Sequence, residues 1–230
     1  DKNLIKKNEE DLYAEKIIYL PDIWNCHSGY NFTRELNGLP FKKNRYVTFG
    51  SFNNYRKIND DVIEVWSEIL KKVKNSKLIL KTSFPISTEM YKKKFDTFGV
   101  LGSVTFLPFK KEFGNHLEIY KKIDIALDTF PWNGVTTSFE AIWMGIPVIT
   151  MKGYNFNSRC GESINKNVKM DNLIAENKKD YINKTVSLAQ NENELEKIRK
   201  NIYDNALKTP LFDQKRFCNQ FFSALEKIYN

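Results

Sequence analysis

The chain has 230 residues, of which 41% are hydrophobic and 28% are charged. This composition supports one large domain or two small ones and argues against a membrane protein. No stretch approaches the roughly 18 uninterrupted apolar residues of a transmembrane helix, and the amino-terminal sequence DKNLIKKNEED lacks the apolar centre of a signal peptide. We therefore expect a soluble, cytoplasmic protein with no membrane partner.

The charge pattern and the metal-binding residue types exclude two further classes. The formal net charge is +8, but the lysines fall in short clusters mixed with acidic residues, a pattern typical of solvated helix faces. A concentrated basic strip with interleaved aromatics is missing, so we expect no nucleic-acid partner. The three cysteines, Cys26, Cys160 and Cys218, lie far apart, and only His27 and His116 supply imidazole. We therefore expect reduced thiols, no metal site and no cofactor.

The first 44 residues differ in character from the rest of the chain. An extended run, EKIIYLPDIWNC, is followed by a polar stretch that contains Gly and Asn, and Pro21 and Pro40 fix local turns. A segment of this length without regular structure is uncommon inside a compact domain. We therefore predict an interdomain connector over 1–44, a single lobe over 45–230, and further protein sequence upstream.

From residue 45 onward, strand-like apolar runs alternate with helical patterns. The predicted strands occupy residues 46–52, 77–81, 103–107, 123–127 and 146–150. The first intervening helix carries Val62, Trp66, Ile69 and Val73 on one stripe. Alternation of this kind predicts an α/β fold in which a Rossmann-like parallel sheet is flanked by helices.

The last third of the chain reads as a helical tail. An irregular stretch, NFNSRCGES, precedes a short helix and an edge strand near Leu173-Ile174. Apolar residues at helical spacing then predict helices over 180–190, 192–207 and 213–229.

The block between the last two long strands carries the clearest chemical signal. Gly134 allows a sharp turn, and Thr136 and Thr137 place hydroxyls at the first turn of the helix that follows, where backbone N–H groups lack internal partners. An anion such as a phosphate fits there. Glu140, one turn later on nearly the same face, is placed to accept hydrogen bonds from ribose hydroxyls. The alternative is that one threonine caps the helix and Glu140 favours its positive end.

A second polar group follows the first strand. Lys57 is a compact cation able to neutralise a diphosphate, and Asn54 is an amide donor within reach of phosphate oxygens. Asn59 or Asp60 is suited to cap the next helix. Because ligands bind along the carboxyl edge of a parallel sheet, this loop and the threonine pair should lie on the same edge. The alternative is that Lys57 is one exposed lysine of many.

Three further residues have a functional and a structural interpretation. Arg159 is able to bind a phosphate or a structural carboxylate, and Ser163 to cap a helix that begins near Ile164. His116 is able to stack on a base or donate to a phosphate, or to serve as an ordinary polar residue.

The motifs TFGSFNNYRKIND, KLILK, HLEIYKKIDIALDTFPWNGVTTSFEAIWMGIPVITMKG and SRCGESI resemble the C-terminal lobe of the O-linked N-acetylglucosamine transferase family, which includes the plant SPINDLY proteins. The resemblance runs from about Tyr13 to the end of the chain. It implies a GT-B glycosyltransferase of family 41, in which two Rossmann-like lobes face each other and the C-terminal lobe holds the UDP part of a UDP-sugar such as UDP-GlcNAc.

The resemblance also assigns roles to residues. It implies that Lys57 stabilises the departing diphosphate and that Asn54, often glutamine in the family, binds phosphate. Thr136 and Thr137 would hold the diphosphate beside Gly134, and Glu140, aspartate in animal members, would bind ribose. His116 would lie near the nucleotide. Where animal members carry a histidine before the threonine pair, this chain has Val135.

The implied reaction is an inverting, metal-independent O-glycosyl transfer to a protein acceptor. Acceptor-binding groups and the catalytic base would come from an N-terminal lobe and its tetratricopeptide repeats, so this chain alone should bind UDP weakly and transfer little. Two alternatives are a non-catalytic nucleotide-binding module and a GT-B transferase for a non-protein acceptor. An NAD-dependent oxidoreductase is disfavoured because no GxGxxG follows the first strand.

Overall fold

The computed structural model describes residues 1–30, 38–82, 85–108 and 113–229. Within them, six strands form one parallel sheet in the order β3-β2-β1-β4-β5-β6. The strands are β1 (Thr48–Ser51), β2 (Lys77–Thr82), β3 (Val104–Pro108), β4 (Ile125–Leu127), β5 (Val148–Met151) and β6 (Ile174–Ala175). The parallel sheet and each predicted strand, including the short edge strand, are confirmed.

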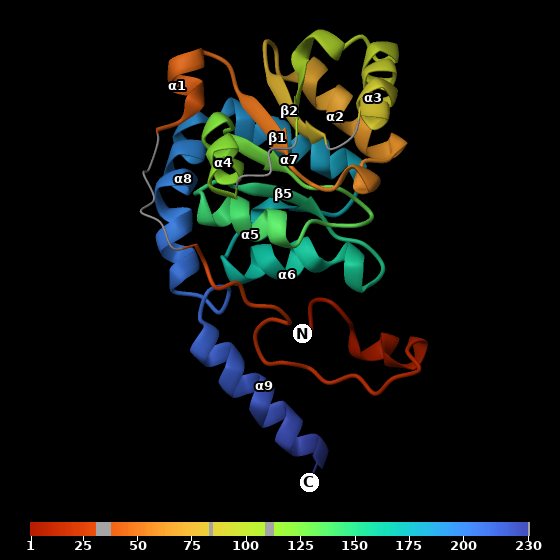
Figure 1. Cartoon of the computed structure of the whole chain (residues 1–230), viewed down its shortest axis with the longest axis vertical. Helices are drawn as coiled ribbons and strands as arrows, with labels where there is room; N and C mark the ends of the chain where they lie inside the picture. Colours follow the sequence, from red (N-terminus) through yellow and green to blue (C-terminus); the bar gives the residue numbers. More distant parts are fainter. Residues whose placement is uncertain (31–37, 83–84, 109–112, 230) are drawn as a thin grey trace.

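Helices precede, separate and follow these strands (Figure 1). The α-helices are α1 (Pro40–Asn44), α2 (Asp60–Lys72), α3 (Pro85–Thr97), α4 (Phe113–Glu118), α5 (Thr136–Trp143), α6 (Cys160–Asn167), α7 (Lys178–Gln190), α8 (Glu192–Leu207) and α9 (Gln214–Tyr229). Short 3-10 turns are η1 (Lys7–Leu12), η2 (Tyr55–Lys57), η3 (Leu101–Ser103), η4 (Ile119–Lys122), η5 (Phe156–Ser158) and η6 (Asp171–Leu173). The predicted helical tail corresponds to α7, α8 and α9.

The strand order creates a switch point between β1 and β4. From β1 the chain proceeds outward through β2 to β3, and it then returns to β4 and proceeds the other way through β5 to β6. Right-handed crossovers place α2 and α3 on one face of the sheet and α5 and α6 on the other. In such sheets a ligand binds at the carboxyl ends of the two strands that flank the switch point.

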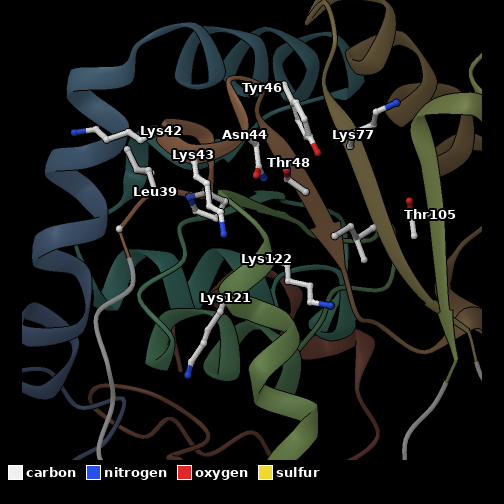
Figure 2. A pocket seen from close by; sticks show the side chains of 13 residues that line it. Leu39, Lys42, Lys43, Asn44, Tyr46, Thr48, Lys77, Thr105, Lys121 and Lys122 are labelled. Carbon is white, nitrogen blue, oxygen red and sulfur yellow. The ribbon is translucent and has the colours of Figure 1, made fainter.

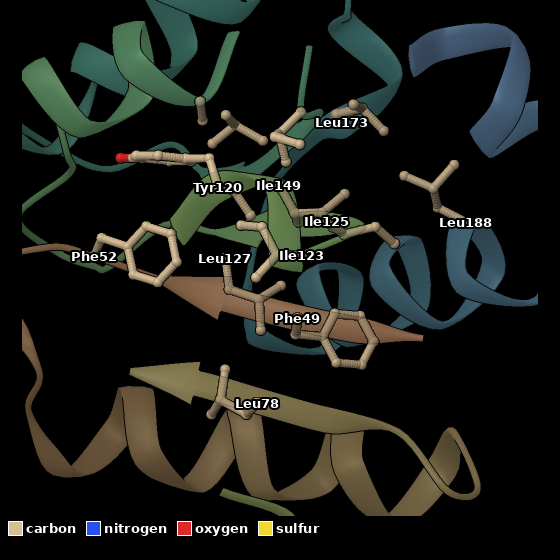
Figure 3. Packing of buried hydrophobic residues seen from close by; sticks show 14 of the residues in the cluster. Phe49, Phe52, Leu78, Tyr120, Ile123, Ile125, Leu127, Ile149, Leu173 and Leu188 are labelled. Carbon is tan, nitrogen blue, oxygen red and sulfur yellow. The ribbon is translucent and has the colours of Figure 1, made fainter. Parts of the chain in front are cut away.

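The central strands are covered on both faces, which explains their continuous apolar sequences. All residues of β1 and β4 are buried, whereas burial alternates along β2. Figure 3 shows Phe49, Leu78, Ile125, Leu127 and Ile149 packed together in this core, and all five are at most 2% exposed. The core therefore fixes the sheet on which the polar loops stand.

Helix α2 starts where a local capping rule predicts. The side chain of Asn59 accepts a hydrogen bond from the Val62 amide at 2.9 Å. Of the two caps that the sequence suggests, Asn59 is the one used. Acidic residues in the first turn and lysines in the last turn suit the helix dipole.

The amino-terminal segment is packed against the lobe. Residues 1–30 pass below α6 and beside α9, which projects away from the sheet (Figure 1). Leu4 and Ile5 form a small apolar cluster with Cys160 of α6, and Asp22 pairs with Arg216 of α9. The boundary predicted after residue 44 stays a prediction, because a connector can also pack against the lobe that it precedes.

Candidate functional site

A buried carboxylate organises the carboxyl edge of the sheet. Asp128 directly follows β4 and is 2% exposed. Its Oδ1 accepts hydrogen bonds from the amides of Gly134 at 2.6 Å and Thr129 at 2.9 Å, and its Oδ2 accepts from the Thr150 hydroxyl at 2.7 Å. Burial raises the pKa of Asp128 to about 6, against the opposite effect of these donors. The carboxylate thus joins the ends of β4 and β5 to the loop before α5.

Position 134 requires glycine because a larger residue would not fit, and not because the backbone there has a positive φ. A Cβ at this position would lie 2.5 Å from Thr137 Oγ1 and 2.8 Å from Asn53 Oδ1, and the glycine is not among those with positive φ. The Thr137 hydroxyl donates to Asn53 Oδ1 at 2.9 Å. The end of β1 and the start of α5 are therefore in direct contact across the switch point.

The amino end of α5 is open to a ligand. Its N-cap is Val135, which makes no side-chain cap, and the first helical bonds run from Ser138 and Phe139 to the Val135 carbonyl, both at 3.0 Å. The amides of Thr136 and Thr137 precede those bonds. The alternative that either threonine caps the helix is therefore wrong. Thr136 is exposed and Thr137 is half-buried, so both lie at the accessible end of the helix.

Lys57 lies beside this helix end. Its Nζ donates to the Asn133 carbonyl at 2.6 Å and lies 4.9 Å from the centre of the Trp132 ring. Burial lowers the pKa of Lys57, and the charge of Asp128 acts in the opposite direction. Asn133 lies three residues before Thr136, the first residue of α5, so this bond holds the ammonium at the loop that leads into the helix. The alternative of an isolated surface lysine does not fit this position.

Asn54 caps the 3-10 turn η2, which ends at Lys57. Its Oδ1 accepts from the Arg56 amide at 3.0 Å and thereby caps η2. The side chain is exposed. A phosphate contact through the amide nitrogen stays a prediction.

Glu140 is buried and receives three hydrogen bonds. Donors are Tyr120 Oη at 2.8 Å, His116 Nε2 at 2.9 Å and Tyr30 Oη at 3.1 Å. Burial raises the pKa of Glu140, but the hydrogen bond from His116 and those from the tyrosines outweigh burial, so the pKa is lowered. A ribose hydroxyl that binds this carboxylate has to share it with these donors or replace one of them.

His116 connects Glu140 to a second cation. Lys81 Nζ donates to His116 Nδ1 at 2.7 Å, which leaves the Nε2 proton for Glu140. Burial lowers the pKa of Lys81. The histidine is thus oriented by partners on both ring nitrogens, and its contact with a nucleotide stays a prediction.

Arg159 and Ser163 both face the amino-terminal segment. The Arg159 guanidinium binds the Glu9 carboxylate with two bonds of 2.5 and 2.8 Å, and Arg159 is 3% exposed. Of its two interpretations, the structural carboxylate is the one observed, and the hydrogen bond from Arg159 lowers the pKa of Glu9 to about 2. The predicted helix start near Ile164 is wrong.

Helix α6 begins earlier, at Cys160, so Ser163 lies inside it and does not cap it. Its hydroxyl donates to Asp1 Oδ2 at 2.7 Å. The early start is possible because Gly161 packs without a side chain against Thr150 and Asp128, where a Cβ would lie 2.0 Å and 2.8 Å from their side-chain oxygens.

Sequence reasoning missed several polar residues at this edge: Asn53, Asp128, Thr150, Tyr30 and Tyr120. The first three carry a usable signal, since a polar residue that directly follows or ends a buried strand falls at the carboxyl edge of the sheet. The two tyrosines carry none, because their contact with Glu140 depends on tertiary packing.

Two absences apply only to the parts of the chain that the structure describes. There, no group of three His, Cys, Asp or Glu side chains is placed to hold a metal ion. In the same ranges, no helix combines the length and the apolar character needed to cross a membrane.

Solved structures share this fold. A mutant of the O-GlcNAc transferase from Thermobaculum terrenum superposes with a TM-score of 0.86 at 24% identity, over 100% of this chain and 43% of that one. The C-terminal domain of a glycosyl transferase group 1 family protein, LpcC, from Francisella tularensis gives a TM-score of 0.60 at 17% identity, over 77% of this chain and 94% of that one. The fold is that of the C-terminal Rossmann-like lobe of a GT-B glycosyltransferase.

The sequence comparisons narrow this class. The chain belongs to glycosyl transferase family 41, whose family model matches residues 30–221. A probable UDP-N-acetylglucosamine–peptide N-acetylglucosaminyltransferase SPINDLY from Hordeum vulgare is 32% identical over 97% of this chain, and its counterpart from Eustoma exaltatum subsp. russellianum is 35% identical over 89%. The chain spans about a quarter of the length of these relatives, 24% and 23% respectively. The family resemblance inferred from the motifs is confirmed.

Proposed function

We propose that this lobe binds the UDP part of a UDP-sugar in an enzyme that transfers the sugar to a hydroxyl of a protein acceptor. The observation that carries the proposal is the position of the Lys57 ammonium, 2.6 Å from the Asn133 carbonyl and directly before the open amino end of α5. A cation and unpaired helix amides that face one place provide what a diphosphate needs.

The same arrangement suits the chemistry of the leaving group. As the bond from the anomeric carbon to UDP breaks, negative charge grows on the diphosphate, and preorganised donors that face this charge lower the barrier. Thr136 adds an exposed hydroxyl beside the helix amides, and the Thr137 hydroxyl adds another when it releases Asn53 Oδ1. The growing charge is then stabilised by Lys57 and α5 without a metal ion, and attack by the acceptor from the opposite side inverts the anomeric centre.

Glu140 supplies the ribose contact in this proposal. Its carboxylate lies one turn into α5, is kept ionised by its donors, and retains lone pairs for hydroxyl donors. Tyr30 Oη makes the longest of its three bonds, at 3.1 Å, and is the donor that a ribose hydroxyl replaces most readily.

The remaining parts of the enzyme lie outside the chain. Relatives about four times as long are named as peptide N-acetylglucosaminyltransferases, and we assign acceptor binding and the base to an N-terminal lobe with tetratricopeptide repeats. The lobe alone is then inactive. The three cysteines are unpaired in the structure, which supports a cytoplasmic location for the whole protein.

Calorimetric titration of the chain with UDP, in the presence and absence of EDTA, tests the proposal. UDP is expected to bind, to bind more tightly than ADP or NAD, and to bind equally with EDTA. Loss of binding with EDTA would contradict metal independence. Absence of binding both here and in the full-length protein would favour a module that has lost its donor site.

A further inference from the structure

A second polar concavity lies at the amino edge of the sheet, opposite the site described above. A cavity of about 630 Å³ opens between α1, η4 and the first residues of β1 and β2 (Figure 2). Its described lining includes five lysines and neither aspartate nor glutamate. The lysines are Lys42, Lys43, Lys77, Lys121 and Lys122. We refer to this cavity as the lysine pocket.

Two of the lysines at the rim are neutralised by neighbours. Lys42 pairs with Glu196 at 2.8 Å, and Lys121 pairs with Glu118 at 2.7 Å. The other three have no carboxylate partner among the residues that the structure describes: Lys43, Lys77 and Lys122. The pocket therefore concentrates positive charge that the described residues leave uncompensated.

Helix dipoles account for only part of this arrangement. Lysines in the last turn of a helix are favourable in general, and Lys43 and Lys122 occupy such positions. However, α1 has five residues and η4 has four, so their dipoles are weak, and Lys77 begins a strand. The dipole of each element gives no reason for three elements to place lysines around one cavity that no aspartate or glutamate lines. Like charges around one cavity cost electrostatic energy without a counter-ion.

The floor of the pocket contains an unsatisfied hydroxyl. Thr48 is 3% exposed, and its Oγ1 has no hydrogen-bond partner. A buried unpaired hydroxyl destabilises the fold. The backbone amide of Thr48 donates to Asp124 Oδ2 at 2.8 Å, and the Phe41 amide donates to Asp124 Oδ1 at 3.0 Å. The nearest buried carboxylate is thus committed to the backbone that holds α1 over the pocket.

We propose that the lysine pocket binds a small anion that carries phosphate groups. Its volume falls within the range of about 300–1,000 Å³ typical of small-molecule sites. Lys77 Nζ donates to the Gly102 carbonyl at 3.0 Å. The ammonium groups of Lys43 and Lys122 then match the two negative charges of a phosphomonoester, and lysine binds phosphate as a point charge. The hydroxyl and amide groups of Asn44, Tyr46 and Thr105 line the same cavity and add uncharged partners.

The two anion sites are independent. The pocket includes Thr48, the first residue of β1, whereas Asn53, which contacts the start of α5, lies five residues further along the chain. A rise of roughly 3.3 Å per residue separates them by about 16 Å. One diphosphate does not span this distance. The proposal therefore does not depend on the function assigned to the carboxyl edge.

The test is a titration of the ¹⁵N-labelled chain with inorganic pyrophosphate, followed by backbone amide shifts at about 0.15 M salt. We expect saturable shifts at Asn44, Thr48 and Lys77 with a dissociation constant on the order of 1 mM or below. The shifts should persist with excess UDP, which occupies the other edge. Shifts confined to Gly134 and Thr137, or no saturation, would overturn the proposal.

Two pairs of Lys→Gln variants distinguish binding of the anion in the lysine pocket from general attraction of the anion to a positively charged chain. Lys43→Gln with Lys122→Gln should weaken binding about tenfold or more, whereas Lys208→Gln with Lys215→Gln removes the same charge from exposed positions elsewhere and should leave it unchanged. Equal weakening by both pairs would refute a built site. A phosphoserine peptide is the second probe: tighter binding than pyrophosphate identifies a phosphorylated chain as the source of the anion, and weaker binding identifies a free compound.

Discussion

The two edges of the sheet use polar residues in opposite ways. At the carboxyl edge, polar groups are buried and hydrogen-bonded around Asp128. The packing there leaves no space for a side chain at Gly134 or Gly161. At the amino edge, five lysines line an open cavity, and three of them lack a carboxylate partner among the described residues.

In the two proposals above, this difference separates two kinds of anion recognition. The carboxyl edge positions a few donors by packing, so small changes in volume should be costly there. The amino edge relies mainly on the charge of exposed lysines, so the fold should tolerate changes of these side chains. Substitutions at matched residue types on the two edges test this distinction, and they are given below from the largest expected effect to the smallest.

Lys57→Ala should produce the largest effect on function. In the full-length protein we expect the turnover of sugar transfer to fall by about 10²–10³-fold, because the cation that faces the leaving diphosphate is lost. The melting temperature should change little, since the side chain is half-buried and makes one backbone contact. Lys208→Ala, an exposed lysine outside both sites, is the control. Unchanged turnover in Lys57→Ala would refute the assigned role.

Gly161→Ala should produce the largest effect on stability. The added Cβ would lie 2.0 Å from Thr150 Oγ1, so we expect a loss of about 3 kcal/mol in the free energy of unfolding. Helix propensity alone predicts the opposite sign, a gain of about 1 kcal/mol. Gly102→Ala is the control, because nothing lies within 4 Å of its added Cβ. Urea unfolding of both variants measures the change in the free energy of unfolding. A loss in Gly161→Ala shows that close packing dominates, and a gain shows that helix propensity does.

Asp128 should make the stability depend on pH in an identifiable window. Its pKa is about 6 in the folded chain and about 3.9 when unfolded. Below about pH 4, Asp128 is protonated in both the folded and the unfolded state. Between about pH 4 and 6 only the folded state keeps this proton, and above about pH 6 both states have lost it. The native free energy of unfolding therefore falls by about 3 kcal/mol across this window because of Asp128.

Asp128→Asn removes that contribution, and Asp124, whose pKa burial also raises, is present in both proteins and cancels in their difference. The unfolding free energy of the native chain, relative to that of the variant, should thus decrease between pH 4 and 7. Chemical denaturation at several pH values measures it. A difference that does not change with pH would show that the folded pKa of Asp128 is not raised.

Lys43→Gln should produce the smallest effect on stability. The side chain is exposed and belongs to the amino edge, so we expect a change within about 0.5 kcal/mol in the free energy of unfolding. Thermal melting of this variant beside Gly161→Ala compares the two edges directly. A large loss would mean that the lysine pocket is a structural element rather than a binding surface.

The sequence predicts the fold well because the relevant signals are local. Strands buried on both faces read as apolar runs, and Asn59 starts α2 through a cap that involves the next three residues. The positions of Lys57, Thr136 and Thr137 at one edge follow from strand order alone, since the carboxyl ends of parallel strands share an edge.

The rest of the site depends on contacts between distant residues. Tyr30 reaches Glu140 across 110 positions, and no local pattern indicates it. The start of α6 depends on how closely Gly161 approaches Thr150. No local pattern predicts this contact, so the sequence alone places Ser163 at the cap of a later helix. A guanidinium binds either a phosphate or a carboxylate, so the sequence leaves both partners open for Arg159. The position of Glu9 in the folded chain shows that the partner is a carboxylate.

The pairing of Arg159 with Glu9 has a consequence for truncation and proteolysis. A lobe trimmed to start at residue 45 would lose the Glu9 carboxylate and the Leu4 carbonyl as partners of the Arg159 guanidinium, while the Gly153 carbonyl would remain. The cut would also remove Tyr30 from Glu140 and expose the apolar surface around Cys160. We expect such a fragment to melt earlier and to aggregate, so a protease that cuts after residue 30 would abolish UDP binding by the lobe without cutting its sheet.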